Sequence, residues 1–402
     1  MKIGICGPFN PYSLKNELNY NGELPNINKG ATAVNTYVRE LLRQGHKVIV
    51  ITSAIPGGNS DIVIESTNIK IHIVRSNPSI FISHVFSRIY MISRLEKTIS
   101  KYIDEMDVLH AQWTYDFAYA AKKFTDVVPV FCTVRDWCPY IITMHHGLKK
   151  IQWYLYSLIN NSVMKNANVH FIANSHYTYN QIIKAYPEKN IYTIFNPIDK
   201  DYILSSKSNE IKDVTFITIA SNITEKRKNI LKLIRAFNLY YKYNPKSKLK
   251  VVGEIEGSKD LFINDLKKEN LLQGITFCGM LDHKSLIKEI DSSTCLIHPS
   301  LEETFGNILL EGMARCLPVI GGMNSGAVPF VLGKGEFGIL CDVNDVNSIV
   351  NAMKMSEDTS KCACLVQKAT NNLIKNYQSD SITYQHLALY EKYINKQKTD
   401  SL

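Results

Sequence analysis

The sequence predicts an α/β protein built from two doubly wound, parallel-sheet domains. Short apolar runs rich in β-branched residues alternate with amphipathic stretches, and this alternation starts afresh after a polar segment at residues 197–213. The chain of 402 residues is long enough for two domains with substantial cores. Apolar strands separated by amphipathic helices form parallel sheets that helices cover on both faces. Because ligands bind beyond the carboxyl ends of such strands, we expect two Rossmann-like domains facing each other across a cleft.

The first domain is expected over residues 1–196. Its strands are predicted at residues 2–6, 47–52, 108–112, 128–134, 169–175 and 191–196. A long polar loop follows the first strand and leads through a small-residue turn at Gly30 to a helix that ends at Gly45. Gly30 can bring backbone N–H groups close to a ligand phosphate because it has no side chain. A simple helix entry explains this turn equally well.

The second domain is expected over residues 197–379, and a helix over about residues 380–402 is expected to pack back on the first domain. Its strands are predicted at residues 214–221, 248–254, 275–280, 295–300, 318–322 and 337–342. Neither domain contains the G-x-G-x-x-G pattern of dinucleotide-binding enzymes or a P-loop. The sequence therefore argues against a dehydrogenase and against a P-loop ATPase.

The stretch "LEETFGNILLEGMARCLPVIGG" at residues 301–322 holds two carboxylates on either side of a Phe-Gly pair. A helix is predicted from Gly306 to Arg315, so Glu303 lies in the loop before it and Glu311 lies inside it. A helix N-terminus attracts phosphate, and a buried carboxylate can accept two hydrogen bonds from a diol. A phosphate and a diol together indicate a nucleotide ligand. The plainer alternative is a surface helix with two solvated acids.

The composition is that of a soluble globular protein with an uneven charge. Residues 1–195 contain 20 Lys and Arg against 13 Asp and Glu, a balance of +7, whereas residues 196–402 contain 26 against 24, a balance of +2. The basic residues are scattered, so we expect a solvated surface and no nucleic-acid partner. No apolar run approaches the roughly 18 residues that cross a bilayer, and the first one ends at Gly7, too early for a signal peptide. A cytoplasmic protein is expected.

The sequence offers little support for a metal site. The nine cysteines include no C-x-x-C and the eleven histidines no H-E-x-x-H. Five cysteines lie in predicted strands, where buried reduced thiols fit best: Cys6, Cys132, Cys278, Cys295 and Cys341. Asp199 and Asp201 form a D-x-D, a pattern that holds Mg²⁺ or Mn²⁺ in other enzymes. It lies in the connection between the domains with a lysine between the acids, so we predict no bound metal.

Nine segments, in their order along the chain, resemble the retaining GT-B glycosyltransferases of the glycosyl transferases group 1 family. They are "INKGATAVNTYVRELLRQGHKVIVIT", "DVLHAQW", "CTVRDWCPY", "ANSHYTYNQI", "IFNPID", "EKRKNILKLIRAF", "LKVVGE", "ITFCGML" and "HPSLEETFGNILLEGMARCLPVIGG". The resemblance runs over about residues 1–355 and is most specific over residues 295–340.

This resemblance implies the GT-B fold and a reaction. The enzyme would move a hexose-type sugar from a nucleotide diphosphate sugar of the UDP or GDP type to an acceptor, keep the anomeric configuration, and need no cofactor besides the donor. It points loosely to bacterial surface polysaccharide assembly, such as that of lipopolysaccharide. The acceptor would then be a glycan or a polyprenyl-linked sugar.

The resemblance also assigns roles within the motif of residues 303–311. It implies that Glu311 binds the ribose hydroxyls and that Glu303 contacts hydroxyls of the donor sugar. The further donor contacts that it implies are Thr304 and the backbone N–H groups of Phe305, Gly306 and Asn307, which would hold the diphosphate. This placement agrees with the general attraction of a helix N-terminus for phosphate.

Lys228, in the segment "EKRKN", resembles the family lysine that pairs with the departing diphosphate. A fixed cation there stabilises the charge that develops as the glycosidic bond breaks, and Arg227 is expected to assist. Two positions depart from the family pattern. Asn222 stands where many relatives have arginine, which keeps hydrogen bonding but loses a charge on the phosphate. Arg135 and Asp136 stand where many relatives have His-Asp, so Asp136 is the catalytic candidate of the first domain and no neutral imidazole is expected beside it.

Two other functions stay open at this point. A nucleotide-sugar epimerase shares the two-domain architecture and a nucleotide-binding acid. A noncatalytic protein that binds a sugar or a nucleotide would need the same binding residues but would show no turnover with any acceptor.

Two aromatic and basic stretches raise the question of membrane contact. In residues 78–103, apolar residues recur at helical spacing, which usually indicates a helix that faces its own domain. They are Ile82, Val85, Phe86, Ile89, Ile92 and Leu95. In residues 145–159, lysines alternate with tryptophan and tyrosine, as they do in surface-bound helices. We predict that the first domain takes the acceptor and touches the inner face of the plasma membrane through anionic lipid.

Overall fold

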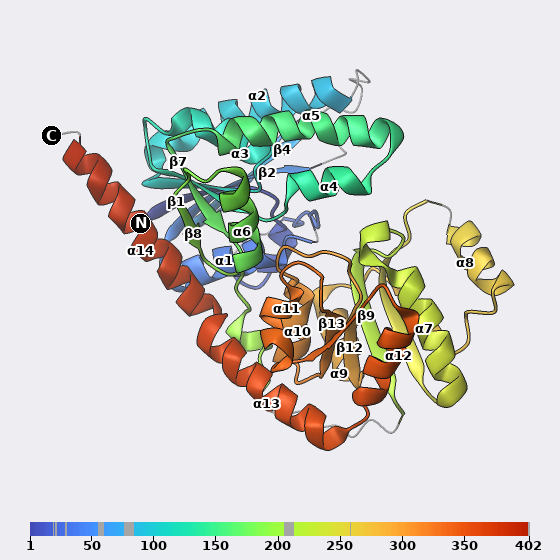
Figure 1. The fold of residues 1–402 in the computed structure, drawn as a ribbon. Coiled ribbons are helices and arrows are strands. Elements are labelled where there is room, and N and C mark those ends of the chain that lie inside the picture. Colours follow the sequence, from blue (N-terminus) through green and yellow to red (C-terminus); the bar gives the residue numbers. More distant parts are fainter. Residues whose placement is uncertain are drawn as a thin grey trace. The chain divides into compact units, whose positions relative to one another are not determined.

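The computed structural model describes residues 1–18, 20, 22–28, 30–54, 60–75, 84–204, 213–257 and 259–400. The chain divides into two compact units. Unit 1 comprises Met1–Pro197 together with Ser379–Leu402, and unit 2 comprises Ile198–Gln378. Each unit is built on a parallel sheet with helices on it, so the predicted α/β fold class is confirmed (Figure 1).

Unit 1 is built on an eight-stranded sheet with the order β3-β4-β2-β1-β5-β6-β7-β8. The strands are β1 (Lys2–Cys6), β2 (Lys47–Ala54), β3 (Ile62–Ser66), β4 (Ile69–Arg75), β5 (Val108–Gln112), β6 (Val130–Val134), β7 (Val169–Ala173) and β8 (Ile191–Thr193). Neighbouring strands are parallel except for β3, which pairs with β4 in the antiparallel sense. Every strand of this sheet except β3 and β4 was predicted from the sequence.

The helices of unit 1 cover both faces of its sheet. They are α1 (Thr32–Arg43), α2 (His84–Tyr102), α3 (Asp116–Ala121), α4 (Cys138–Met144), α5 (Gly147–Met164), α6 (His176–Ala185) and α14 (Ser379–Asp400). Along β2, Val48 and Val50 belong to the core beneath α1 and α14, whereas Ile49 and Ile51 belong to the core beneath α2 and α3. Successive strand residues point to opposite faces, so a sheet covered on both faces needs strands that are apolar throughout.

The C-terminal helix α14 packs in unit 1, as the sequence analysis expected. Leu387 and Tyr390 of α14 are buried in the same core as Tyr37 of α1. The hydroxyls of Tyr37 and Tyr390 lie 2.8 Å apart, and the Tyr390 hydroxyl also lies 2.5 Å from Nδ1 of the buried His110. Buried polar groups need such partners, so this network stabilises α14 on the sheet of unit 1.

Unit 2 is built on a six-stranded, wholly parallel sheet with the order β11-β10-β9-β12-β13-β14. The strands are β9 (Thr215–Asn222), β10 (Lys248–Glu254), β11 (Ile275–Gly279), β12 (Cys295–His298), β13 (Val319–Gly322) and β14 (Ile339–Cys341). All six were predicted. The chain first builds outward from β9 to β11 and then returns to add β12 on the other side of β9. The carboxyl ends of β9 and β12 therefore form the topological switch point, where open α/β sheets bind their ligands.

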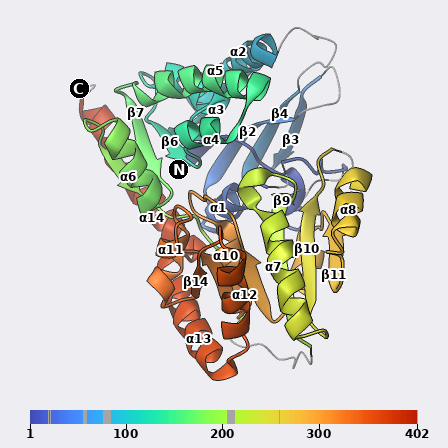
Figure 2. The same cartoon turned by 45° about the vertical axis from the view of Figure 1, so that its right-hand side comes forward.

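The helices of unit 2 follow its strands (Figure 2). They are α7 (Ile230–Tyr243), α8 (Lys259–Lys268), α9 (His283–Asp291), α10 (Asn307–Ala314), α11 (Val328–Val331), α12 (Val346–Met355) and α13 (Thr359–Asn376). Helix α10 is the helix predicted over residues 306–315, with Gly306 and Arg315 as its caps. Its Leu309 and Met313 are buried, and this places Glu311 on another side of the helix.

The strand cysteines and the apolar content of the helices are two further features that the sequence predicted. Four of the five strand cysteines are buried, whereas Cys278 is only partly buried because β11 is an edge strand. None of the helices in the described ranges combines the length and the apolar content that a membrane-spanning segment needs.

Candidate active site

Two loops of unit 2 meet at the switch point. The loop after β9 ends in the 3₁₀ turn Lys226–Lys228, and the loop after β12 leads to α10. Asn229 joins the two loops: its backbone adopts the left-handed conformation, with φ of 57°, and its side-chain amide donates to the carbonyl of Pro299 after β12 at 3.2 Å. The same amide donates to the carbonyl of Val343 after β14 at 2.8 Å. The backbone N–H of Leu301 also donates to the carbonyl of Arg227 at 2.8 Å. These contacts fix the two loops against each other.

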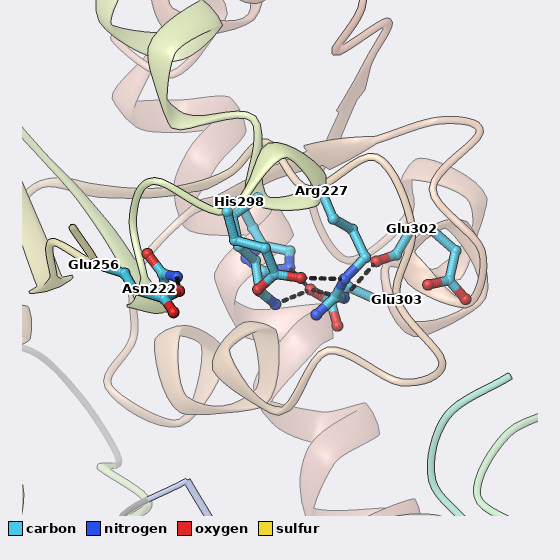
Figure 3. A network of polar contacts seen from close by, with 8 residues as sticks. Asn222, Arg227, Glu256, His298, Glu302 and Glu303 are labelled. Atoms are coloured by element: carbon cyan, nitrogen blue, oxygen red, sulfur yellow. Dashed lines mark hydrogen bonds and ion pairs between the residues drawn. The ribbon is translucent and has the colours of Figure 1, made fainter. Parts of the chain in front are cut away.

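Glu303 is the centre of a charged cluster between these loops (Figure 3). Its Oε1 accepts a hydrogen bond from Nζ of Lys228 at 2.6 Å and lies 3.1 Å from Nε2 of His298. Nη1 of Arg227 lies 3.5 Å from the same oxygen and donates to the carbonyl of Glu302 at 3.0 Å. The structure therefore brings together three of the predicted catalytic residues and adds His298, which the sequence analysis missed.

The protonation states of this cluster follow from burial and charge. Burial alone would raise the pKa of Glu303, but Lys228, His298 and Arg227 together outweigh it and hold the pKa well below its usual range. Burial lowers the pKa of His298 more than the nearby carboxylate raises it. Glu303 is thus an anion and His298 a neutral donor at pH 7. An ionised, fixed carboxylate is suited to accept hydrogen bonds from hydroxyl groups.

The backbone of Glu303 is held from a third loop. Its carbonyl accepts a hydrogen bond from the N–H of Ala327 at 2.8 Å, and Glu303 forms an isolated β-bridge with Gly326. Gly326 has φ of 63°, and a Cβ atom there would lie 2.3 Å from the Glu303 carbonyl oxygen. Only glycine allows this approach, so the loop after β13 helps to position Glu303.

Helix α10 begins directly after Glu303. Gly306 is its N-cap and has φ of 87°, a conformation that glycine adopts without strain. Phe305 is buried with its ring 5.9 Å from that of Tyr377, and Thr304 is also buried. These packed residues fix the N-terminus of α10 next to the cations of Arg227 and Lys228. A helix N-terminus and two cations together favour a doubly charged phosphate group.

Glu311 lies one helical turn into α10. Among the residues that the structure describes, the Glu311 carboxylate has no hydrogen-bond or ion-pair partner, and burial raises its pKa to about 7. Because no protein group binds this carboxylate, both of its oxygens can accept hydrogen bonds from a ligand. This agrees with the predicted contact to a diol.

Asn222, a predicted donor contact, is hydrogen-bonded within unit 2, and its role in donor binding stays a prediction. Its amide N–H donates to Oε2 of Glu256 at 2.5 Å, and its Oδ1 accepts from the backbone N–H of Thr224 at 2.9 Å. Figure 3 shows this pair apart from the cluster at Glu303. The residue that replaces the family arginine is therefore paired with an acid, and Arg227 and Lys228 are the cations that the structure places at the switch point.

Comparisons with known proteins identify the family of the chain. A family profile described as "Glycosyl transferases group 1" matches residues 202–376, and one described as "Glycosyltransferase Family 4" matches residues 30–202. The chain belongs to the GT-B glycosyltransferases.

One curated relative and two solved structures match this glycosyltransferase over nearly its whole length, at low sequence identity. N-acetyl-alpha-D-glucosaminyl L-malate synthase of Bacillus anthracis is 22% identical over 379 residues, which are 90% of this chain and 94% of that protein. The solved structure of a sucrose-phosphate synthase from Thermosynechococcus elongatus superposes with a TM-score of 0.78 at 16% identity, over 97% of this chain and 98% of that one. HepE of Anabaena, solved in complex with UDP and glucose, gives 0.67 at 16% identity, over 98% and 100%.

The remaining candidate residues of the glycosyltransferase belong to unit 1. Gly30 is exposed, and a Cβ atom there would meet nothing within 4 Å, so the backbone at this turn does not require glycine. Asp136 follows β6 and is partly buried. Its neighbour Arg135 donates to Oε1 of Gln112 at 2.7 Å and to Oδ1 of Asn196 at 2.6 Å. The roles assigned to Gly30 and Asp136 stay predictions.

The D-x-D of the glycosyltransferase has a structural role. Oδ1 of Asp199 accepts a hydrogen bond from the backbone N–H of Asp201 at 3.1 Å and caps the 3₁₀ turn Lys200–Tyr202. Within the described residues, no three His, Cys, Asp or Glu side chains are grouped as metal ligands would be.

Proposed function

We propose that this glycosyltransferase retains the anomeric configuration and moves a hexose-type sugar from a UDP- or GDP-type nucleotide sugar to a glycan or polyprenyl-linked acceptor in polysaccharide assembly. The observation that carries the proposal is the cluster at the switch point of unit 2. There the cations of Lys228 and Arg227 share the ionised carboxylate of Glu303 beside the N-terminus of α10. Opposite charges are thus fixed where a charged donor and its hydroxyl groups would bind.

The parts of the donor match the groups of the site. The diphosphate would face the N-terminus of α10 and the two cations. The ribose diol would face Glu311, and hydroxyls of the sugar would donate to Glu303. HepE, a structural neighbour, was solved with UDP and glucose, and this supports a donor of the UDP type.

The chemistry would follow from these contacts. The bond between the anomeric carbon and the diphosphate oxygen breaks, and its electron pair goes to the leaving diphosphate. Lys228 and Arg227 stabilise that charge as it develops. The acceptor hydroxyl attacks the same face of the sugar, so that a carbon–oxygen bond forms and its proton passes to the leaving phosphate. This route needs no covalent nucleophile from the protein.

A donor panel tests the proposal. We expect a single nucleotide sugar to raise the melting temperature, since a ligand at 100 times its dissociation constant adds about 2.7 kcal/mol of stability. With that donor, free nucleotide should appear only when an acceptor is supplied. An epimerised nucleotide sugar that forms without acceptor would favour an epimerase. Stabilisation without turnover across a broad acceptor panel would leave a binding protein.

Transfer is expected to continue in excess EDTA. Lys228, Arg227 and the N-terminus of α10 already place positive charge at the diphosphate, the role that a divalent cation takes in other enzymes. The measurement is the initial rate of nucleotide release before and after chelation, with added Mn²⁺ as the comparison. Complete loss of activity that Mn²⁺ restores would contradict metal independence and bring Asp199 and Asp201 back as ligands.

A further inference from the structure

Exposed apolar side chains are concentrated on two helices of unit 1. Eighteen large apolar residues are exposed among those that the structure describes, and six of them lie on α2 and α5. We call these six the outer patch: Ile89 (57% exposed) and Tyr90 (40%) of α2, and Leu148 (86%), Ile151 (60%), Tyr154 (61%) and Leu158 (53%) of α5. Figures 1 and 2 both show α2 and α5 side by side.

The packing of these helices does not need the outer patch. Ile92 and Leu95 of α2 and Val163 and Met164 of α5 are buried in the core of unit 1, so each helix already has an apolar inner face. The core interpretation of residues 78–103 is therefore confirmed for Ile92 and Leu95, but it is wrong for Ile89, which is exposed. The side chains of Ile82, Val85 and Phe86 lie outside the described part of the chain. On α5, Leu148, Ile151 and Leu158 are spaced by three and seven residues, which places them on one stripe of the helix.

Aromatic and charged contacts also hold the two helices together. The guanidinium of Arg88 on α2 lies 3.4 Å from the ring centroid of Tyr156 on α5 and forms a salt bridge with Asp116 of α3 at 2.7 Å. Trp153 of α5 packs with its ring 5.9 Å from that of Tyr115. The inner side of α5 is therefore rigidly seated, and the outer patch is surface that the fold leaves open.

The charge around the outer patch is positive. Helices α2 and α5 contain six Lys and Arg residues and one acid, Glu96, whose carboxylate forms a salt bridge with Lys123. Four of these lysines are exposed: Lys97, Lys101, Lys149 and Lys150. Apolar and aromatic residues flanked by lysines are typical of helices that lie in an anionic membrane surface. A second copy of the chain would instead bring these like charges together.

We propose that the outer patch docks unit 1 on an anionic membrane, with the stripe of α5 in the headgroup layer and the flanking lysines on the lipid phosphates. This goes beyond sugar transfer, and it rests on the proposed function only for the identity of a lipid-linked acceptor. Apolar burial supplies attachment, and anionic lipid supplies selectivity. Binding is consequently reversible and weakens as salt increases.

Cosedimentation of the full chain with vesicles tests the docking. At low salt we expect pelleting with vesicles of phosphatidylcholine and phosphatidylglycerol, and none with phosphatidylcholine alone. The variant K149Q/K150Q should bind about thirtyfold more weakly, since each cation near an anionic surface contributes roughly fivefold. The variant L148Q/I151Q/L158Q should lose binding at least tenfold through lost apolar burial.

A matched control removes three exposed apolar side chains from unit 2. The variant L231Q/L239Q/L261Q changes residues that are 40%, 41% and 66% exposed, and it should bind vesicles like the wild type. Equal pelleting with anionic and neutral vesicles would overturn the proposal. An equal loss of vesicle binding in L148Q/I151Q/L158Q and L231Q/L239Q/L261Q would overturn it as well. So would a dimer in sedimentation velocity that only the α5 variant dissociates, because the patch would then bind a second copy.

The same variants separate this inference from the proposed function. Stabilisation by the donor should be unchanged in the α5 variant, because the outer patch belongs to unit 1 and the candidate donor site belongs to unit 2. Transfer to a soluble acceptor should be unchanged as well, because none of the three replaced residues is a candidate site residue. Vesicle binding without any transferase activity would sink the proposed function and leave the docking intact. Full transferase activity without vesicle binding would overturn the docking proposal and support the proposed function.

Discussion

The variant Lys228→Ala is expected to lower kcat by about 10²–10³-fold, with a smaller effect on donor affinity. Nζ of Lys228 lies 2.6 Å from Oε1 of Glu303, so its position is fixed. In the proposed mechanism the departing diphosphate lies beside this cation. In the ground state Arg227 and the N-terminus of α10 can still hold the donor, whereas the transition state gains charge that only a nearby cation offsets. Initial rates over a range of donor concentrations separate the two effects.

Lys226 supplies the matched control for this variant. It belongs to the same 3₁₀ turn and its side chain is exposed, so Lys226→Ala should leave kcat and KM close to the wild type. Loss of Lys228 also removes the strongest attraction that lowers the pKa of Glu303. That pKa should rise, and the acid limb of the pH–rate profile should move to higher pH. Equal losses in the two lysine variants, or an unchanged kcat in Lys228→Ala, would refute the assigned role.

The fold was predictable because most strands of both sheets are covered on both faces. Such strands appear as continuous apolar runs with an amphipathic helix between them. The hairpin of β3 and β4 has no helix between its strands and turns through two residues, Thr67 and Asn68. Val63 of β3 is 41% exposed, so this edge strand alternates in polarity instead of forming an apolar run. The prediction relied on apolar runs with a helix between them, and the hairpin of β3 and β4 does not have this pattern.

The candidate site was predictable only in part. Local sequence places Glu303 before a helix and Glu311 within it, and the structure bears this out. The contact of Lys228 with Glu303 joins residues 75 positions apart, and it forms because β9 and β12 are neighbours in the sheet. Strand order is not encoded in local polarity, so this pair could come only from the family resemblance or the structure.

Two supporting residues gave weaker signals. His298 ends a buried strand, where a histidine is more often a core residue than a member of a charged cluster. Gly326 is one of 20 glycines, and only its φ of 63° and the nearby Glu303 carbonyl show why glycine is needed there. Both residues act on the position of Glu303 through geometry that arises in the folded chain.

The buried carboxylate of Glu311 lowers the free energy of unfolding of the protein when no donor is bound. Its pKa is raised by burial from 4.5 to about 7, so the folded state resists ionisation that the unfolded state permits. The folded state binds more protons in this range, and the free energy of unfolding therefore falls as pH rises from 4.5 to 7. The variant Glu311→Gln lacks this penalty. At pH 8 it should be more stable than the wild type by about 1–3 kcal/mol, and at pH 4 the two should be alike.

We have proposed that the Glu311 carboxylate accepts two hydrogen bonds from the ribose diol. The same variant, in which a neutral amide replaces this carboxylate, should therefore bind the donor nucleotide about 10–100-fold more weakly at pH 8. In the wild type, affinity should fall as pH decreases below 7, by up to about tenfold per pH unit, since protonation of Glu311 removes the charged acceptor. Calorimetric titration with the nucleotide sugar between pH 6 and pH 8 measures both effects, and the affinity of Glu311→Gln should not change with pH in this range.

Inorganic diphosphate is the control ligand for this prediction. It has no ribose, so its affinity should be the same in the wild type and in Glu311→Gln. A nucleotide affinity that Glu311→Gln leaves unchanged, or an equal loss for inorganic diphosphate, would show that Glu311 does not hold the diol.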